Sequence, residues 1–304
     1  MAPRKFRFLM SDSPSTAWST PAAVASTRSA RTWRMTLLVS FYTSRGIVYA
    51  ADQAITINQG SGPERCPKQK KLLTTSRLGL SGGVVGFFGL AVVGHEPMES
   101  WLRAALDRWP GSQHPAELGE YLRDELNRSV PVPQRDGNAS GFHIGAFERR
   151  DGLAVPVMQH VSNIYGYDPS TSTVYSNYGR YQTTEHFPSH PNAATSLADV
   201  PPSGLRQELR RREEETGLPH WFRNGELAFV APAWHGLTWS INTIRDRLGG
   251  RFRLPDDLEK WELMAKVLVR TNADLFDLLM ISGDPTIEGP YDTETIAWPP
   301  AITS

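Results

Sequence analysis

The sequence contains little cysteine and no excess of either charge. Cys66 is the single cysteine among 304 residues, so no internal disulfide can form, and this usage is typical of a reducing cytoplasm. We therefore expect a cytoplasmic protein. The 32 Lys and Arg residues balance 32 Asp and Glu residues. This neutrality gives no electrostatic reason to expect nucleic acid or an anionic membrane as a partner.

The chain also lacks an apolar run long enough for a membrane-spanning helix, which takes about 20 residues. The most hydrophobic stretch, residues 78–94, carries no charge but contains six glycines. We interpret it as a buried strand, a tight turn and a helix that continues through residues 99–109. Near the N-terminus, the apolar segment 6–10 is too short for a secretory signal.

Motifs for metal or phosphate binding are missing as well. The histidines have no close paired spacing, because Pro188 lies between His186 and His190 and prevents a shared helix face. The glycine-rich segment 82–89 lacks the lysine of a phosphate-binding loop. A nucleophilic role for Cys66 is disfavoured, because its proline-flanked polar loop offers no partner. We expect no metal and no cofactor.

Residues 1–35 differ in composition from the rest of the chain. Residues 1–34 contain six basic residues, one acid and many Ser, Thr and Ala residues. This composition is typical of a transit peptide or a disordered arm, and the segment could also be a propeptide. A further alternative is that Met35 is the true start. Its removal would then free the amine of Thr36 directly.

The stretch that organises the remainder of the chain is residues 35–83. Apolar runs at 37–41 and 47–51 flank a polar segment that ends in glycine, which predicts a β-hairpin. A strand advances about 3.3 Å per residue, so two strands of equal length bring their outer ends together. The hairpin is therefore expected to return Asp52 to the neighbourhood of Thr36.

A third apolar run, residues 72–81, follows a lysine-rich loop and ends in Gly82-Gly83. If this run pairs beside the hairpin, Thr36, Asp52, a lysine and a glycine amide converge at one end of one sheet. A threonine hydroxyl becomes a useful nucleophile only when a base takes its proton. At a chain terminus its own α-amine, with a reference pKa near 8, can be that base.

This arrangement resembles the proteasome β-subunit family of N-terminal-nucleophile hydrolases, as a divergent bacterial-type member. The phrase Gly46-Ile47-Val48-Tyr49-Ala50-Ala51-Asp52 matches the family pattern, and Asp52 follows Thr36 at the family spacing of 16 positions. The resemblance implies a four-layer αββα sandwich of two antiparallel sheets. It covers a single domain, residues 36–304, with a helical insertion near 180–255.

The resemblance also implies a threonine-type peptidase or amidohydrolase. Thr36 would be the nucleophile, Lys71 would lower the pKa of its amine, Asp52 would hold the lysine, and an N–H of Gly82 or Gly83 would bind the oxyanion. Lys68 is the alternative lysine, because it lies at the family spacing when no gap is allowed. We favour Lys71, which directly precedes the apolar run. A peptide or small amide substrate and assembly into a homo-oligomer are also implied.

Two departures from the family pattern favour a rival interpretation. The family has arginine where this chain has Ala54, and its supporting Ser and Asp have no counterpart in the matching loop Asn224-Gly225-Glu226. The rival is a non-catalytic, proteasome-like scaffold or binding subunit, in which Thr36 is never exposed as a terminus.

Apolar periodicity predicts the remaining elements. Helices are expected at residues 115–128, at 205–216, at 226–247 and from Pro255-Asp256 onward. Strands are expected at residues 142–148, 155–162, 174–177 and 293–298, and loops at 131–141 and 194–204.

Overall fold

The computed structural model describes most of the chain within one compact unit, residues 33–304. Thr36, Ala54, Cys66, His190, Gly225, Glu226 and residues 1–35 lie outside the described part. The described residues are 37–53, 56–58, 63–65, 68–135, 139–163, 167–168, 173–174, 179–188, 197–224, 227–279 and 290–300.

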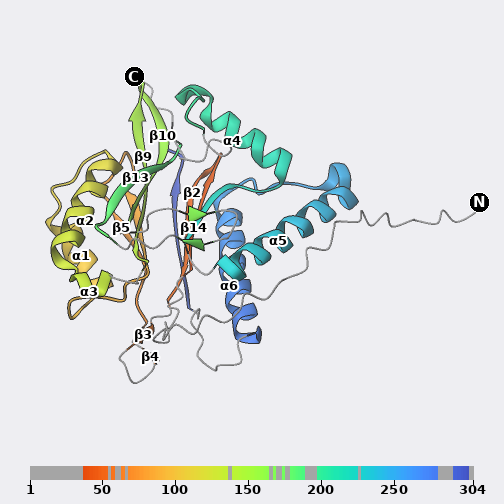
Figure 1. Ribbon diagram of the computed structural model, residues 1–304. Helices are drawn as coiled ribbons and strands as arrows, with labels where there is room; N and C mark the ends of the chain where they lie inside the picture. The colour runs from red at the N-terminus through yellow and green to blue at the C-terminus, as the bar shows by residue number, and fades with distance from the viewer. Residues whose placement is uncertain are drawn as a thin grey trace, which may run out of the picture. The chain divides into compact units, whose positions relative to one another are not determined.

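The fold mixes helices with two antiparallel sheets (Figure 1). The four-stranded sheet has the order β14-β1-β2-β15, and the five-stranded sheet has the order β13-β10-β9-β6-β5. The first sheet comprises β14 (His220–Asn224), β1 (Leu38–Thr43), β2 (Gly46–Asp52) and β15 (Tyr291–Ala297). The second comprises β13 (Gln182–Phe187), β10 (Leu153–Ser162), β9 (Gly141–Arg150), β6 (Gly83–Phe88) and β5 (Leu72–Thr75).

Both faces of β1 are buried, which explains its continuous apolar sequence. Successive side chains of a strand point to opposite faces. Leu38 and Tyr42 pack into a core that includes Val84 and Phe147 of the five-stranded sheet, so the two sheets face each other. On the other face, Val39 and its neighbours pack against helix α6 (Leu258–Leu279).

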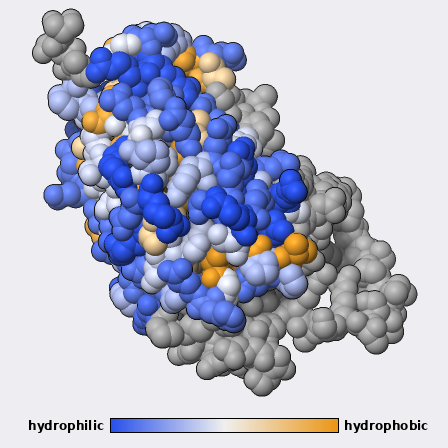
Figure 2. All heavy atoms as spheres, turned by 90° about the vertical axis from the view of Figure 1, so that its left-hand side faces the viewer, coloured by the Kyte–Doolittle hydropathy of each residue, from blue (hydrophilic) through white to orange (hydrophobic). Residues whose placement is uncertain are grey.

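Helices cover the outer face of each sheet. α1 (Met98–Arg108) and α2 (Pro115–Ser129) bury residues such as Leu102 and Leu122 against the five-stranded sheet. Their solvent side is mostly hydrophilic, as expected for amphipathic helices (Figure 2). α5 (Leu227–Leu248) packs beside α6 on the far side of the four-stranded sheet (Figure 1).

Another helix, α4 (Pro202–Thr216), holds the turn of the β1–β2 hairpin. The Glu213 carboxylate accepts hydrogen bonds from the Ser44 N–H at 2.6 Å and from the Ser44 hydroxyl at 2.7 Å. The Arg206 guanidinium donates to the Ser44 carbonyl at 2.9 Å. These contacts fix the end of the hairpin that lies opposite Asp52.

The predicted hairpin is confirmed, with a turn at Ser44-Arg45 that is shorter than expected. Of the apolar run over residues 72–81, only the first four residues form a strand. β5 stops at Thr75, and the chain then turns through Gly79 and Gly82, which have φ values of +66° and +95°. Glycine adopts these left-handed conformations without the steric cost that other residues bear. Gly83 therefore opens β6 instead of ending a strand.

The helix expected to start within residues 78–94 and continue through 99–109 is confirmed only in its second part, because α1 begins at Met98. A small hairpin of β7 (Val92–Val93) and β8 (Glu96–Pro97) separates it from β6. The loop expected at 131–141 contains the short helix α3 (Val132–Arg135).

The other predicted helices are confirmed within a few residues, as is the β9–β10 hairpin. The segment near 180–255 is part of both sheets, since it supplies the edge strands β13 and β14, which periodicity did not predict. Of the strand expected at 174–177, only the first residue is described as strand. The remaining elements are β3 (Thr56–Asn58), β4 (Pro63–Arg65), β11 (Tyr167–Asp168), β12 (Thr173–Val174) and the 3₁₀ turn η1 (Gly249–Arg251). Among the described residues, no helix is long and apolar enough to cross a membrane.

Candidate active site

Asp52 lies at the end of β2 and joins two other parts of the chain through one oxygen atom. Its Oδ1 accepts the backbone N–H of Leu37 at 2.8 Å and the Lys71 ammonium at 2.9 Å. The Asp52 N–H returns a hydrogen bond to the Leu37 carbonyl at 3.2 Å. The β1–β2 register, in which Leu38 pairs with Ala51, brings these ends together.

Lys71 directly precedes β5, and its side chain is fully buried. Burial lowers the pKa of the Lys71 ammonium, and the neighbouring charge of Asp52 opposes this shift. The pKa remains below the ordinary value of a lysine. An ammonium of this kind gives up and regains a proton closer to neutral pH than a surface lysine does.

The two candidate lysines have different environments. Lys71 contacts Asp52 inside the fold, whereas the side chain of Lys68 is exposed. The site therefore brings together Asp52 and Lys71, the pair favoured from the sequence, and leaves Lys68 at the surface.

Asp292, on β15, is a site residue that sequence reasoning missed. Its Oδ2 accepts the backbone N–H of Lys71 at 3.0 Å, and its Oδ1 accepts the Gln53 side-chain amide at 2.6 Å. The expected last strand began one residue too late to include it. The available clue was an alternating pair of carboxylates, because Glu294 lies two positions along the same strand and pairs with Lys70 at 2.8 Å.

Gly82 and Gly83 do not converge with Asp52 and Lys71. β5 and β6 pair so that Thr75 lies opposite Gly83, while the N–H of Phe87 donates to the Lys71 carbonyl at 3.1 Å. The glycines therefore lie at the other end of this strand pair, roughly 13 Å along it by strand geometry.

A different glycine lies at the lysine end of β6. Gly89 follows the strand directly and has a φ of +84°. A Cβ at this position would lie 1.9 Å from the Ala139 carbonyl oxygen, so only glycine fits.

Thr36 is outside the described residues. So are Gly225 and Glu226 of the loop that corresponds in position to the family's supporting loop. The next residue, Leu37, carries the amide nitrogen that bonds Thr36 to the chain, and this nitrogen is the one that Asp52 binds. In the supporting loop, Asn224 is described. It ends β14 opposite Leu38, and its side-chain oxygen contacts His143 Nε2.

His143 is buried between the sheets and interacts on both sides of its ring. Its Nδ1 lies 3.4 Å from the Ser40 hydroxyl, opposite the Asn224 contact. Burial lowers the pKa of His143 to about 3, so the imidazole is neutral at physiological pH. Its ring lies 5.2 Å from that of His160, in edge-to-face geometry. These histidines pack as aromatic rings, and within the described ranges no three His, Cys, Asp or Glu residues are placed to hold a metal ion.

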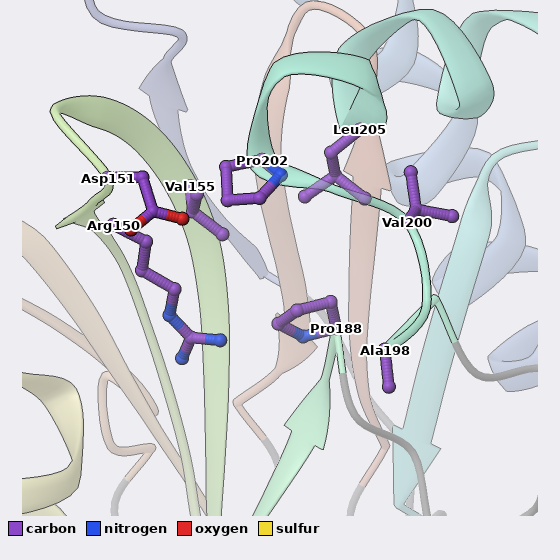
Figure 3. A pocket seen from close by; sticks show the side chains of 8 residues that line it. All are labelled: Arg150, Asp151, Val155, Pro188, Ala198, Val200, Pro202 and Leu205. Carbon is purple, nitrogen blue, oxygen red and sulfur yellow. The ribbon is translucent and has the colours of Figure 1, made fainter.

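A pocket of about 430 Å³ lies between the β9–β10 turn and the start of α4 (Figure 3). Arg150 and Asp151 line it from the β9–β10 turn, and Pro202 and Leu205 line it from α4. Arg150 already pairs with Glu185 at 2.7 Å. None of the lining residues belongs to the group around Asp52.

Comparisons with known proteins give structural similarities at low identity. No protein-family model matches the chain, and no curated protein matches it. A mutant (Gly-1) of Anbu from Hyphomicrobium sp. strain MC1 is 16% identical with a TM-score of 0.43, covering 86% of this chain and 82% of that one. Anbu, an ancestral β-subunit, from Yersinia bercovieri is 13% identical with a TM-score of 0.43, covering 85% and 80%.

Proposed function

We propose that the chain is a threonine-nucleophile hydrolase of amide or peptide bonds, built as a four-layer αββα sandwich. The observation that carries the proposal is the pair of contacts at Asp52. One buried carboxylate oxygen binds both the amide that follows Thr36 and the Lys71 ammonium. A cation beside an N-terminal threonine lowers the pKa of its amine, which is the base in this chemistry. The sequence pattern around Asp52 also resembles the proteasome β-subunit family.

In the proposed reaction, the Thr36 hydroxyl oxygen attacks the substrate carbonyl carbon while the free Thr36 amine accepts the hydroxyl proton. The amide C–N bond then breaks, and the leaving nitrogen takes that proton. Water hydrolyses the resulting ester and restores the threonine. The positive charge of Lys71 favours the neutral form of the Thr36 amine, which is the form that acts as a base.

The oxyanion of the tetrahedral intermediate needs a backbone N–H donor. Gly82 and Gly83 were the candidates from the sequence, but they lie at the far end of β6. We place the donor at the lysine end of the strand, where Gly89 lets the chain turn close to β9.

The proposal includes cytoplasmic location, a peptide or small amide substrate and a homo-oligomer. Light scattering that gives the mass of one chain at micromolar concentration would contradict the oligomer. The rival function is a non-catalytic scaffold. Any residue before Thr36 would convert its amine into an amide, which cannot act as the base.

The deciding experiment concerns the terminus and the nucleophile together. Mass spectrometry of protein purified from its native host should find Thr36 as the first residue. That protein should react covalently with a peptide epoxyketone, which requires both the hydroxyl and the amine of an N-terminal threonine. Thr36→Ala should abolish labelling, whereas Thr36→Ser should keep part of it. A terminus at Met1 or Ala2 together with absent labelling would support the scaffold.

A further inference from the structure

Asp292 holds the two chain segments that carry the candidate site. Gln53 directly follows β2, and Lys71 directly precedes β5. The Asp292 carboxylate binds the Gln53 amide with one oxygen and the Lys71 backbone N–H with the other, at 2.6 Å and 3.0 Å. Asp292 therefore links the end of β2 to the start of β5.

The pairing of β15 with β2 fixes the position of Asp292. Asp292 pairs with Ala51 and Tyr291 pairs with Asp52, so Asp292 lies on the strand next to Asp52, whose carboxylate binds Lys71. On one side of the Lys71 backbone, its carbonyl accepts the Phe87 N–H of β6 at 3.1 Å. On the other side, its N–H donates to the Asp292 carboxylate on the neighbouring sheet, which adds a second constraint.

We propose that Asp292 is a positioning residue, which holds the Lys71 backbone where its ammonium meets Asp52 beside the proposed nucleophile. This inference rests on the proposed function for its catalytic consequence, while the placement of Lys71 can be tested separately. Asp292 acts through Lys71 and is not proposed to touch substrate.

A neighbouring carboxylate offers a matched control. Glu294 lies two residues along β15 and pairs with Lys70, but both side chains are partly exposed, at 23% and 45%. Ion pairs between exposed side chains contribute little to the stability of a fold. Glu294→Gln changes a carboxylate to an amide on the same strand without touching Lys71, so it should leave the site unchanged.

The first experiment measures epoxyketone inactivation of protein with a Thr36 terminus. Asp292→Ala should lower the maximal inactivation rate by about 10- to 100-fold, because a small displacement of an aligned group costs this much. The concentration for half-saturation should stay the same, since the substrate-binding surface is intact. Partial unfolding would instead change both the maximal inactivation rate and the concentration for half-saturation.

A reversed hydrogen bond provides the rescue. Asp292→Asn keeps one oxygen for the Lys71 N–H, and the Gln53 amide can rotate so that its oxygen accepts the new NH2 group, so this variant should be mild. Gln53→Glu alone places two carboxylates together and should lower the inactivation rate. The double variant Gln53→Glu/Asp292→Asn restores a donor–acceptor pair and should recover the inactivation rate to within about threefold of wild type. If the double variant is no better than Gln53→Glu alone, the positioning role is wrong.

The second experiment needs no enzymatic activity. Acetic anhydride should modify Lys70 but spare the fully buried Lys71 in the wild type, as read by peptide mass spectrometry. Asp292→Ala should make Lys71 reactive at least several-fold faster, and Glu294→Gln should not. Equal protection of Lys71 in the wild type and in Asp292→Ala overturns the proposal. If wild-type protein with a free Thr36 never reacts with the epoxyketone, the proposed function fails, while the acylation result still decides the role of Asp292.

Discussion

Asp52 and Lys71 form an ion pair in which neither side chain is exposed, with 2.9 Å between Oδ1 and Nζ. Taking two charges out of water is costly, and their mutual attraction offsets that cost only while both are present. The pair therefore makes the site sensitive to the loss of either partner, even before catalysis is considered.

Removing one charge of this pair should destabilise the fold strongly. Asp52→Asn keeps an oxygen that can accept the Leu37 N–H but leaves the Lys71 ammonium without its counter-charge. We expect the free energy of unfolding to fall by about 3–5 kcal/mol. The measurement is urea unfolding followed by circular dichroism.

A double variant separates charge from packing. Asp52→Asn/Lys71→Met removes both charges and should be more stable than Asp52→Asn alone. Lys70→Ala, which breaks the exposed pair with Glu294, should cost less than about 1 kcal/mol. If Asp52→Asn is as mild as Lys70→Ala, the pair is not buried in solution.

The choice between the two lysines can be decided by substitution. Lys71→Ala should reduce epoxyketone labelling of Thr36 by several orders of magnitude, because nucleophile, base and cation act as a unit. Lys68→Ala should label like the wild type, since its side chain is exposed. The opposite pattern, with only Lys68→Ala inactive, would show that the functional lysine is the one at the ungapped family spacing.

The β1–β2 hairpin could be predicted because two apolar runs flank a polar segment that ends in glycine. The Asp52–Lys71 pair followed from the family resemblance, together with the position of Lys71 directly before an apolar run. The position of Gly82 could not be predicted, because an apolar, glycine-rich run does not reveal where a strand turns. Asp292 was missed for another reason. It binds Lys71 across 221 positions of sequence, and no local pattern reports such a contact.

Two glycines with left-handed backbones test the close approach at Gly89. Gly89→Ala and Gly94→Ala both place a side chain at positive φ, which costs about 1 kcal/mol for a single residue. A Cβ at Gly89 would also meet backbone at 1.9 Å, whereas nothing lies within 4 Å of one at Gly94. Gly89→Ala should therefore lower the thermal midpoint far more than Gly94→Ala. Equal thermal midpoints for the two variants would contradict the close approach of Gly89 to the backbone of Ala139, before β9.

His143 should make the stability of the protein fall in acid. Its pKa is about 3 in the folded state because burial disfavours the charged ring, against a reference value of 6.5. Between these values the unfolded chain binds a proton that the folded protein excludes, so lowering the pH favours unfolding. Stability should be independent of this group above pH 6.5 and fall by up to about 1.4 kcal/mol per pH unit below it. The measurement is the free energy of unfolding in urea at pH 7.5, 6.0 and 5.0.

His143→Gln should reduce the pH dependence of the free energy of unfolding. It should also lower stability at pH 7.5, because Gln can still bond to Asn224 but loses the packing of the ring. His95→Gln, a change at an exposed histidine, should leave the slope as in the wild type. If His143→Gln and the wild type share one slope, burial does not hold the imidazole neutral in the folded protein.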